Sequence, residues 1–311
     1  MDRRGFLLGA AALVTTPRSL AGGGRPLALV TADLESHVVV VDLARGRILR
    51  RIRTPAGPRS VEAVGGVAVV AHTRLGLVSV LDSARVRHVV RGLAEPRYTA
   101  AHPDGRHAFV TDAQRGEVVA IDCARGRIVG RLPVGPLARH LSLDRSGAQL
   151  WVALGSKARE VAVVDVASPD RLRLVERFRP PFHAHDVAFA PDAEHVWLSS
   201  GDRNELAVYR RDGLLLAGPA GDWPPQHISF AGRRAYVTSG WSGTLNIHRL
   251  SGAHVKRTVV PVGSYNVQCA AGRVVTPGLG TGTLTVVADT GAVRATLRVA
   301  RASHDACVLS L

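Results

Sequence analysis

The stretch EPRYTAAHPDGRHAFVTDAQRGEVVAIDCARGRIVGRLPV, residues 95–134, decides the fold of this 311-residue chain. It contains four short runs rich in small and β-branched residues, and turns of Gly, Pro, Asp or Arg separate these runs. Runs of this length and composition are typical of β-strands. Four consecutive strands in a block of about 40 residues indicate one blade of a β-propeller.

The same design recurs along the chain after residue 25. Its second strand aligns at residues 29–31, 69–71, 109–111, 151–153, 197–199, 236–238 and 274–276. The first strands are expected to start at Ser60, Tyr98, His140, His185, His227, Asn266 and His304, at spacings of 38, 42, 45, 42, 39 and 38 residues. Repeats of this period predict an all-β, seven-bladed β-propeller. We assign residues 22–311 to this single domain.

The two ends of the chain are expected to share one blade. The first block begins with its second strand, near Pro26–Thr31, so its own first strand is missing. Residues 303–309 at the far end of the chain have the composition to supply that strand. Pairing of the two ends in one sheet would close the ring and leave no gap between the first and last blades.

Residues 1–21 have the features of an export signal rather than of the fold. Arg3 and Arg4 precede a short apolar run over residues 7–14, and Ser19-Leu20-Ala21 offers a cleavage site of small residues. Paired arginines followed by Phe-Leu resemble a twin-arginine signal; the alternative is an ordinary secretory signal that carries two arginines. Both predict a periplasmic or secreted protein, and no later segment is apolar enough to span a membrane.

The formal net charge of +15 has two interpretations. One is an electropositive surface that attracts an anionic partner, and the other is a coding preference for arginine, since Lys157 and Lys256 are the only lysines. The arginines are scattered over turns and outer strands, without a basic helix or a basic-aromatic stripe. We therefore expect no nucleic-acid partner and a monomeric protein.

The repeat resembles a known family. Tyr236-Val237-Thr238-Ser239 and Phe109-Val110-Thr111-Asp112 are similar to the YVTN motif, and the turn at residues 103–105 and the Ile121-Asp122 strand end also match. Third strands end in aspartate at Asp42, Asp82, Asp122 and Asp165. The resemblance to YVTN-repeat propellers (the YncE-like family) implies a seven-bladed extracytoplasmic propeller. It implies no reaction, because propellers have many functions.

Histidine is concentrated at the first residue of the innermost strands. We call the seven expected starts of the first strands, which are the innermost strands of their blades, the column positions. Only 13 residues of the chain are histidine, yet four of the seven column positions carry one: His140, His185, His227 and His304. Equivalent positions of a closed ring surround one mouth of the central channel. Converging imidazoles are typical ligands of copper or iron, so these four residues form our candidate metal site. The alternative is that each histidine hydrogen-bonds to a neighbour and only fixes its blade.

Other residues are expected around the same mouth. We assign a ligand-binding role to two further column residues, to three arginines that directly precede column positions, and to three residues in loops between second and third strands: Tyr98, Asn266, Arg59, Arg97, Arg139, Asp112, Asp202 and Trp241. The arginines would favour a small anionic ligand. The three cysteines fit no disulfide framework.

The sequence is compatible with more than one function. The chain contains no Gly-rich phosphate loop, no G-x-S-x-G elbow and no C-x-x-C-H haem site. The first hypothesis is a binding protein whose mouth holds a metal ion or a small anion, or docks an extracytoplasmic protein. The alternative is a mononuclear copper- or iron-dependent oxidoreductase, or a metal-assisted lyase or lactonase. Carboxylates at the mouth would favour the lyase or lactonase, and the column itself has none.

Overall fold

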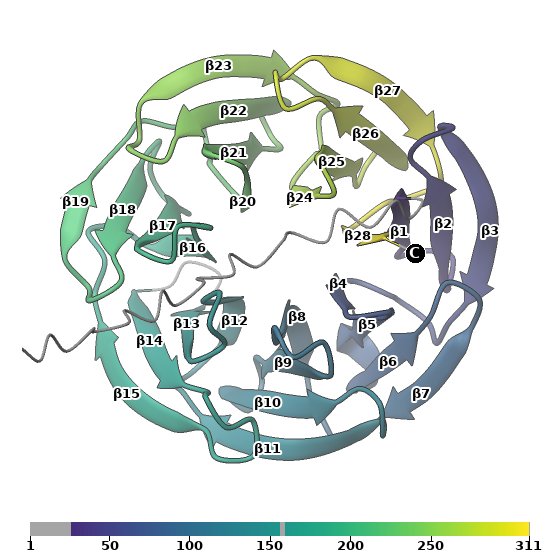
Figure 1. The fold of residues 1–311 in the computed structure, drawn as a ribbon, viewed down its shortest axis with the longest axis horizontal. Helices are drawn as coiled ribbons and strands as arrows, with labels where there is room; N and C mark the ends of the chain where they lie inside the picture. The colour runs from purple at the N-terminus through teal and green to yellow at the C-terminus, as the bar shows by residue number, and fades with distance from the viewer. Residues whose placement is uncertain (1–25, 156–158, 311) are drawn as a thin grey trace, which may run out of the picture.

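The computed structural model describes residues 26–155 and 159–310. The expected signal at residues 1–21 lies outside these residues. Within them, the strands form seven four-stranded antiparallel sheets arranged around a central axis, as Figure 1 shows. The predicted seven-bladed propeller is confirmed. None of the helical segments in this part of the chain is long and apolar enough to cross a membrane.

The strands follow one order in every blade. The innermost strands are β28 (Ala306–Ser310), β4 (Val61–Val64), β8 (Pro96–Ala101), β12 (Ala138–Leu143), β16 (Ala184–Phe189), β20 (Ile228–Ala231) and β24 (Gln268–Ala270). The second strands are β1 (Pro26–Ala32), β5 (Val67–His72), β9 (His107–Asp112), β13 (Gln149–Leu154), β17 (His195–Ser200), β21 (Arg234–Ser239) and β25 (Arg273–Gly278). The third strands are β2 (His37–Asp42), β6 (Leu77–Leu81), β10 (Glu117–Asp122), β14 (Glu160–Asp165), β18 (Leu206–Arg210), β22 (Thr244–Arg249) and β26 (Thr283–Val287). The outermost strands are β3 (Arg47–Arg53), β7 (Val86–Val90), β11 (Arg127–Pro133), β15 (Arg173–Phe178), β19 (Leu215–Ala217), β23 (His254–Val259) and β27 (Val293–Arg298), and a 3-10 helix, η1 (Thr73–Leu75), follows β5.

Closure of the ring takes place as predicted. β28 pairs antiparallel with β1, in a register that places Leu309 opposite Leu27 and Cys307 opposite Leu29. The Thr31 amide also donates to the Asp305 carbonyl at 2.9 Å. The innermost strand of the blade formed by β1, β2 and β3 therefore comes from the other end of the chain, and the pairing covers an edge of β1 that would otherwise be open.

Apolar side chains between neighbouring sheets form the core. Second and third strands are almost entirely buried, because each of their faces packs against an adjacent blade. The packing is mostly Val, Ala and Leu, as in the cluster that joins Val30 and Val39 to Val275 and Val286. Small β-branched side chains suit the tight spacing of stacked sheets. The described cysteines are free, as expected.

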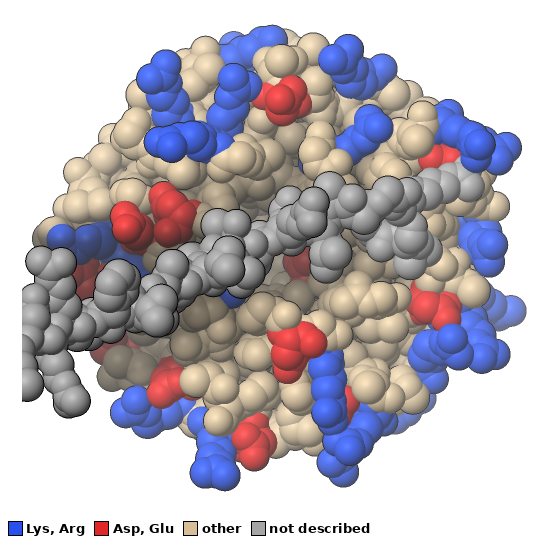
Figure 2. All heavy atoms as spheres, viewed as in Figure 1, with Lys and Arg blue, Asp and Glu red and all other residues tan. Residues whose placement is uncertain are grey.

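The charged residues on the face drawn in Figure 2 lie mainly around the rim. Blue Lys and Arg side chains are spread along it, and red Asp and Glu side chains lie between them. Several pairs are ion pairs on the outer strands, such as Arg87 with Asp82 at 2.6 Å and Arg173 with Asp165 at 3.0 Å. Positive charge on this face is therefore dispersed rather than collected in one patch.

Aspartates at the ends of third strands hold the turn that follows. The Asp122 carboxylate accepts the Arg125 amide at 3.1 Å and the Arg106 guanidinium at 2.6 Å. Asp42 accepts the amides of Ala44 and Arg45 in the equivalent turn. These bonds explain why the repeat places an acidic residue at the strand end.

Deleting residues 302–311 should unfold the whole domain, because the blade would lose β28 and expose the edge of β1. We expect loss of the cooperative thermal transition in circular dichroism. An added peptide of residues 302–311 should restore part of the fold by pairing with β1. A truncated protein that melts like the full-length chain would contradict this role for β28.

Asp122→Asn should lower the free energy of unfolding at pH 7 by about 1 kcal/mol. The Arg106 guanidinium holds the pKa of Asp122 well below its usual range. The stabilisation is therefore complete above the ordinary aspartate pKa of about 3.9 and lost as the pH falls below it. Urea unfolding from pH 7 to pH 3 should show the difference from wild type shrinking. Asp170→Asn, at an exposed side chain, is the control that should have little effect at any pH.

Candidate metal centre

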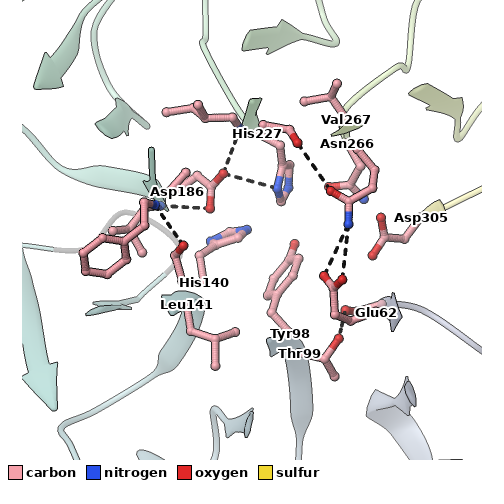
Figure 3. A pocket seen from close by; sticks show the side chains of 18 of the residues that line it. Glu62, Tyr98, Thr99, His140, Leu141, Asp186, His227, Asn266, Val267 and Asp305 are labelled. Atoms are coloured by element: carbon pink, nitrogen blue, oxygen red, sulfur yellow. Dashed lines mark hydrogen bonds and ion pairs between the residues drawn. The ribbon is translucent and has the colours of Figure 1, made fainter. Parts of the chain in front are cut away.

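A local irregularity of the innermost strands turns the column side chains toward the axis. The pairing register shifts in β8, β12 and β16 at the column positions, so that Tyr98, His140 and His185 have no partner on the second strand. A bulge of this kind bends the strand and re-aims a side chain. His227 directly precedes β20. Figure 3 shows Tyr98, His140 and His227 pointing into the central pocket.

Three of the four predicted histidines meet. One nitrogen each from His140, His185 and His227 lies within 4.8 Å of the other two. The ring centroid of His140 is 4.7 Å from that of His185 and 4.8 Å from that of His227, and the last two are 5.5 Å apart. The three consecutive blades whose innermost strands are β12, β16 and β20 therefore each contribute one imidazole to a single cluster, which we call the histidine triad.

The triad is not explained by hydrogen bonds within the protein. His140 is only 1% exposed, and neither of its ring nitrogens has a hydrogen-bond partner among the described residues. The nearest carboxylate to His227 is Asp186 of the preceding blade, whose Oδ2 lies 3.6 Å from Nδ1. A buried polar group without a partner costs about 1–3 kcal/mol. The hypothesis that each histidine only fixes its own blade therefore fails for His140.

Burial keeps the triad uncharged. It lowers the pKa of His140 far below the ordinary value, with a further contribution from His185, and acts in the same way on His227. Burial and then the positive charge of Arg139 lower the pKa of His185 to about 3. Neutral imidazole is the form that coordinates a metal ion. The triad is thus ready to bind a metal at neutral pH without first losing protons.

The fourth predicted ligand, His304, is not part of this cluster. Its Nδ1 lies 3.7 Å from the Asp33 carboxylate, in the loop after β1. Its carbonyl accepts the side-chain amide of Asn266 at 2.7 Å. The structure therefore groups three of the four column histidines and places the fourth, two blades beyond His227, against its own blade.

Two of the predicted arginines, Arg97 and Arg139, act on the triad, and the third, Arg59, acts on His304. Arg139 sits over the ring of Tyr98, with its guanidinium carbon 6.0 Å from the centroid. Arg97 pairs with Glu95 at 2.7 Å. The Nε atoms of both Arg97 and Arg139 are buried, and neither has a hydrogen-bond partner in the part of the chain that the structure describes. After burial, the positive charge of Arg59 is the largest cause of the lowered pKa of His304. This side of the triad is therefore electropositive.

The three predicted loop residues make other contacts. The Asp112 carboxylate accepts the amides of Ala94 and Glu95, which fixes the loop before β8. Asp202 accepts the amide of His183 at 3.1 Å. Trp241 is 68% exposed and packs edge-on against Tyr265. No contact between these three side chains and the triad is found among the residues that the structure describes.

A cavity of about 340 Å³ extends along the axis from the triad. Carboxylates of Glu62, Asp186 and Asp305 line it together with His140 and His227. Burial raises the pKa of Glu62 to about 8 and the pKa of Asp186 and Asp305 to about 7. The column positions themselves hold no carboxylate, as the sequence showed. Asp186 and Asp305 directly follow column histidines, and Glu62 lies two residues after Ser60. This spacing in the sequence could have identified the three cavity carboxylates.

The donor set fits a first-row transition metal. Zinc, copper and iron all accept imidazole nitrogen. Two nitrogens bound to one metal at about 2.1 Å are at most about 4.2 Å apart, so small side-chain rotations from the present spacing would complete the site. Three protein ligands leave at least one coordination position of the metal open, as in catalytic sites where water or substrate occupies that position. The Asp186 carboxylate lies 3.6 Å from Nδ1 of His227, where a small movement would let it accept a hydrogen bond from the imidazole and orient that ring.

Comparisons with known proteins support the fold alone. No protein-family model matches the chain, and no curated protein matches it in sequence. Kuenenia stuttgartiensis hydrazine synthase superposes with a TM-score of 0.73 at 15% identity, over 85% of this chain and 92% of that one. A functionally unknown protein from Desulfotomaculum acetoxidans DSM 771 gives 0.80 at 13% identity, over 91% and 99%. Dihydro-heme d1 dehydrogenase NirN in complex with DHE gives 0.63 at 19% identity, over 88% and 63%.

These solved structures show that the chain is a β-propeller similar to those found in functionally different proteins. At such low identity they transfer no activity or ligand. The resemblance to YVTN repeats therefore depends on the motif residues alone.

His140→Gln should make the metal-free protein less sensitive to acid. Below pH 6.5 the unfolded histidine binds a proton that the buried folded one does not, so stability is highest above pH 6.5 and falls as the pH decreases. The loss is about 1.4 kcal/mol per pH unit for each such group. Urea unfolding at pH 7, 6 and 5 in a chelator should show this part of the slope removed in the variant. His254→Gln, on an exposed strand, should keep the wild-type slope. Equal slopes for all three proteins would mean that His140 is not buried and neutral.

Proposed function

We propose that this protein binds a single copper or iron ion outside the cytoplasm, through His140, His185 and His227. One observation supports this most directly: an almost fully buried imidazole, His140, has no hydrogen-bond partner for either nitrogen within residues 26–155 and 159–310 and lies against two further imidazoles. Keeping three neutral donors together without mutual hydrogen bonds lowers stability, and a bound metal ion would offset that cost. The metal would supply an electrophilic or redox-active centre at the end of the axial cavity.

The surroundings of the triad favour an anionic ligand at the open position. Next to the site, the buried Nε donors of Arg97 and Arg139 have no acceptor among the described residues. Guanidinium groups bind carboxylates and other oxyanions with good geometry. A small anion that reaches the metal with one oxygen would satisfy these donors with another. Docking of a protein partner at the mouth remains the alternative for this binding role.

A catalytic role is the second candidate. Three protein ligands with an open position are typical of metal sites that carry out chemistry. A copper or iron centre of this kind would make the protein an oxidoreductase. The cavity also offers groups for proton transfer, because the raised pKa values of Glu62, Asp186 and Asp305 lie near neutrality. Their presence favours a metal-assisted lyase or lactonase more than the sequence alone did.

We infer export from the sequence of residues 1–21, and the twin-arginine form of the signal would suit a protein that is folded with its metal before export. The YVTN-like repeat supports the same compartment. Fusion of residues 1–25 to a reporter that works only outside the cytoplasm tests this directly. Replacement of Arg3 and Arg4 by lysine should abolish export by a twin-arginine pathway and leave ordinary secretion intact.

Purified protein should contain about one copper or iron per chain, measured by elemental analysis and by equilibrium dialysis with each metal. The variant with alanine at 140, 185 and 227 should bind none. A matched control replaces His102 and His107, which form a separate cluster with the exposed Asp104, by alanine and should keep the metal. His304→Ala should also keep it. Equal metal content in the triad variant and in wild type would refute the site.

A further inference from the structure

Tyr98 occupies the column position on the blade before the triad. It belongs to β8, and the register shift in that strand is the same as in β12 and β16, which carry His140 and His185. Four consecutive blades therefore direct one column residue each toward a common point. Tyrosine differs from histidine in offering an oxygen, which is a metal ligand once the phenol has lost its proton.

The tyrosine ring contacts two of the three imidazoles. Its centroid lies 3.9 Å from that of His140, at an interplanar angle of 34°, and 5.5 Å from that of His227. Figure 3 shows its hydroxyl end pointing to the centre of the pocket, between the two imidazoles. The side chain is therefore directed at the place where a triad-bound metal would lie.

Two arginines lie near Tyr98. The Arg139 guanidinium lies over its ring. Burial raises the pKa of the phenol, and the positive charges of Arg139 and Arg59 act in the opposite direction. Three neutral imidazoles would leave the full charge of a metal ion next to these arginines. A phenolate would reduce that repulsion, because it places a negative charge between the metal and the guanidinium groups.

We propose that Tyr98 is the fourth protein ligand, bound as a phenolate to the metal that the triad holds. On binding, the phenol O–H bond breaks, a metal–oxygen bond forms and the proton leaves to solvent. The inference rests on the proposed function, since it needs a metal at the triad. It assigns the site to an oxidised metal, cupric or ferric, because a hard anionic oxygen stabilises the higher oxidation state.

The test is a visible absorption spectrum of protein loaded with Cu(II) or Fe(III). A phenolate ligand gives an intense charge-transfer band and resonance-enhanced phenolate vibrations, which imidazole ligands do not give. Wild type should show both, and Tyr98→Phe should lose both while still binding about one metal per chain. Tyr265→Phe, which changes a tyrosine that packs on Trp241, is the control and should keep the spectrum.

The outcomes separate the two proposals. Metal bound without the band in wild type, or a band that survives in Tyr98→Phe, would overturn the phenolate ligand and leave the histidine site standing. No metal bound to wild type by dialysis would overturn both. Loss of metal in Tyr98→Phe with an unchanged melting curve would support a ligand role for Tyr98. Loss of metal together with a melting temperature below that of wild type would show that the ring only packs against His140.

Discussion

Pairing of β28 with β1 is the interaction on which the remaining structure depends. It joins the two ends of the chain in one sheet and closes the ring of seven blades. The closed ring holds the innermost strands at similar distances from one axis. Residues 140, 185 and 227 are separated by more than forty positions in sequence, and they meet only because closure brings their strands to that axis.

Closure alone would not assemble the site, because regular strands alternate their side chains between the two faces of a blade. The register shifts in β8, β12 and β16 break that alternation at one position of each strand. They allow a column residue and the residue after it to lie near the axis, as His185 and Asp186 do. Bulges that recur at the same place on three consecutive blades are features of the repeat and position a common site.

The centre of the propeller combines polar groups, each of which would lower the stability of the fold if it were placed there alone. Arginines lie before the column positions, imidazoles occupy them, and carboxylates follow them along the axial cavity. Burial suppresses the charge of the imidazoles and raises the pKa of the carboxylates. A cation held by the imidazoles and balanced by an anionic ligand would interact favourably with both neighbouring layers. Polar groups concentrated in this way are typical of functional sites rather than of cores selected for stability.

The sequence by itself determined the fold, because strand composition, turn residues and a period near forty are local properties repeated seven times. It also located the histidine column, since equivalent positions in equal repeats must lie on one ring. Only the tertiary structure decided that His304 stays apart from the other three, that Glu62, Asp186 and Asp305 share the cavity, and that Asp112 and Asp202 bind backbone amides instead. These outcomes depend on the bulges and on side-chain directions across neighbouring blades, and such contacts join residues far apart in the chain that no local pattern specifies.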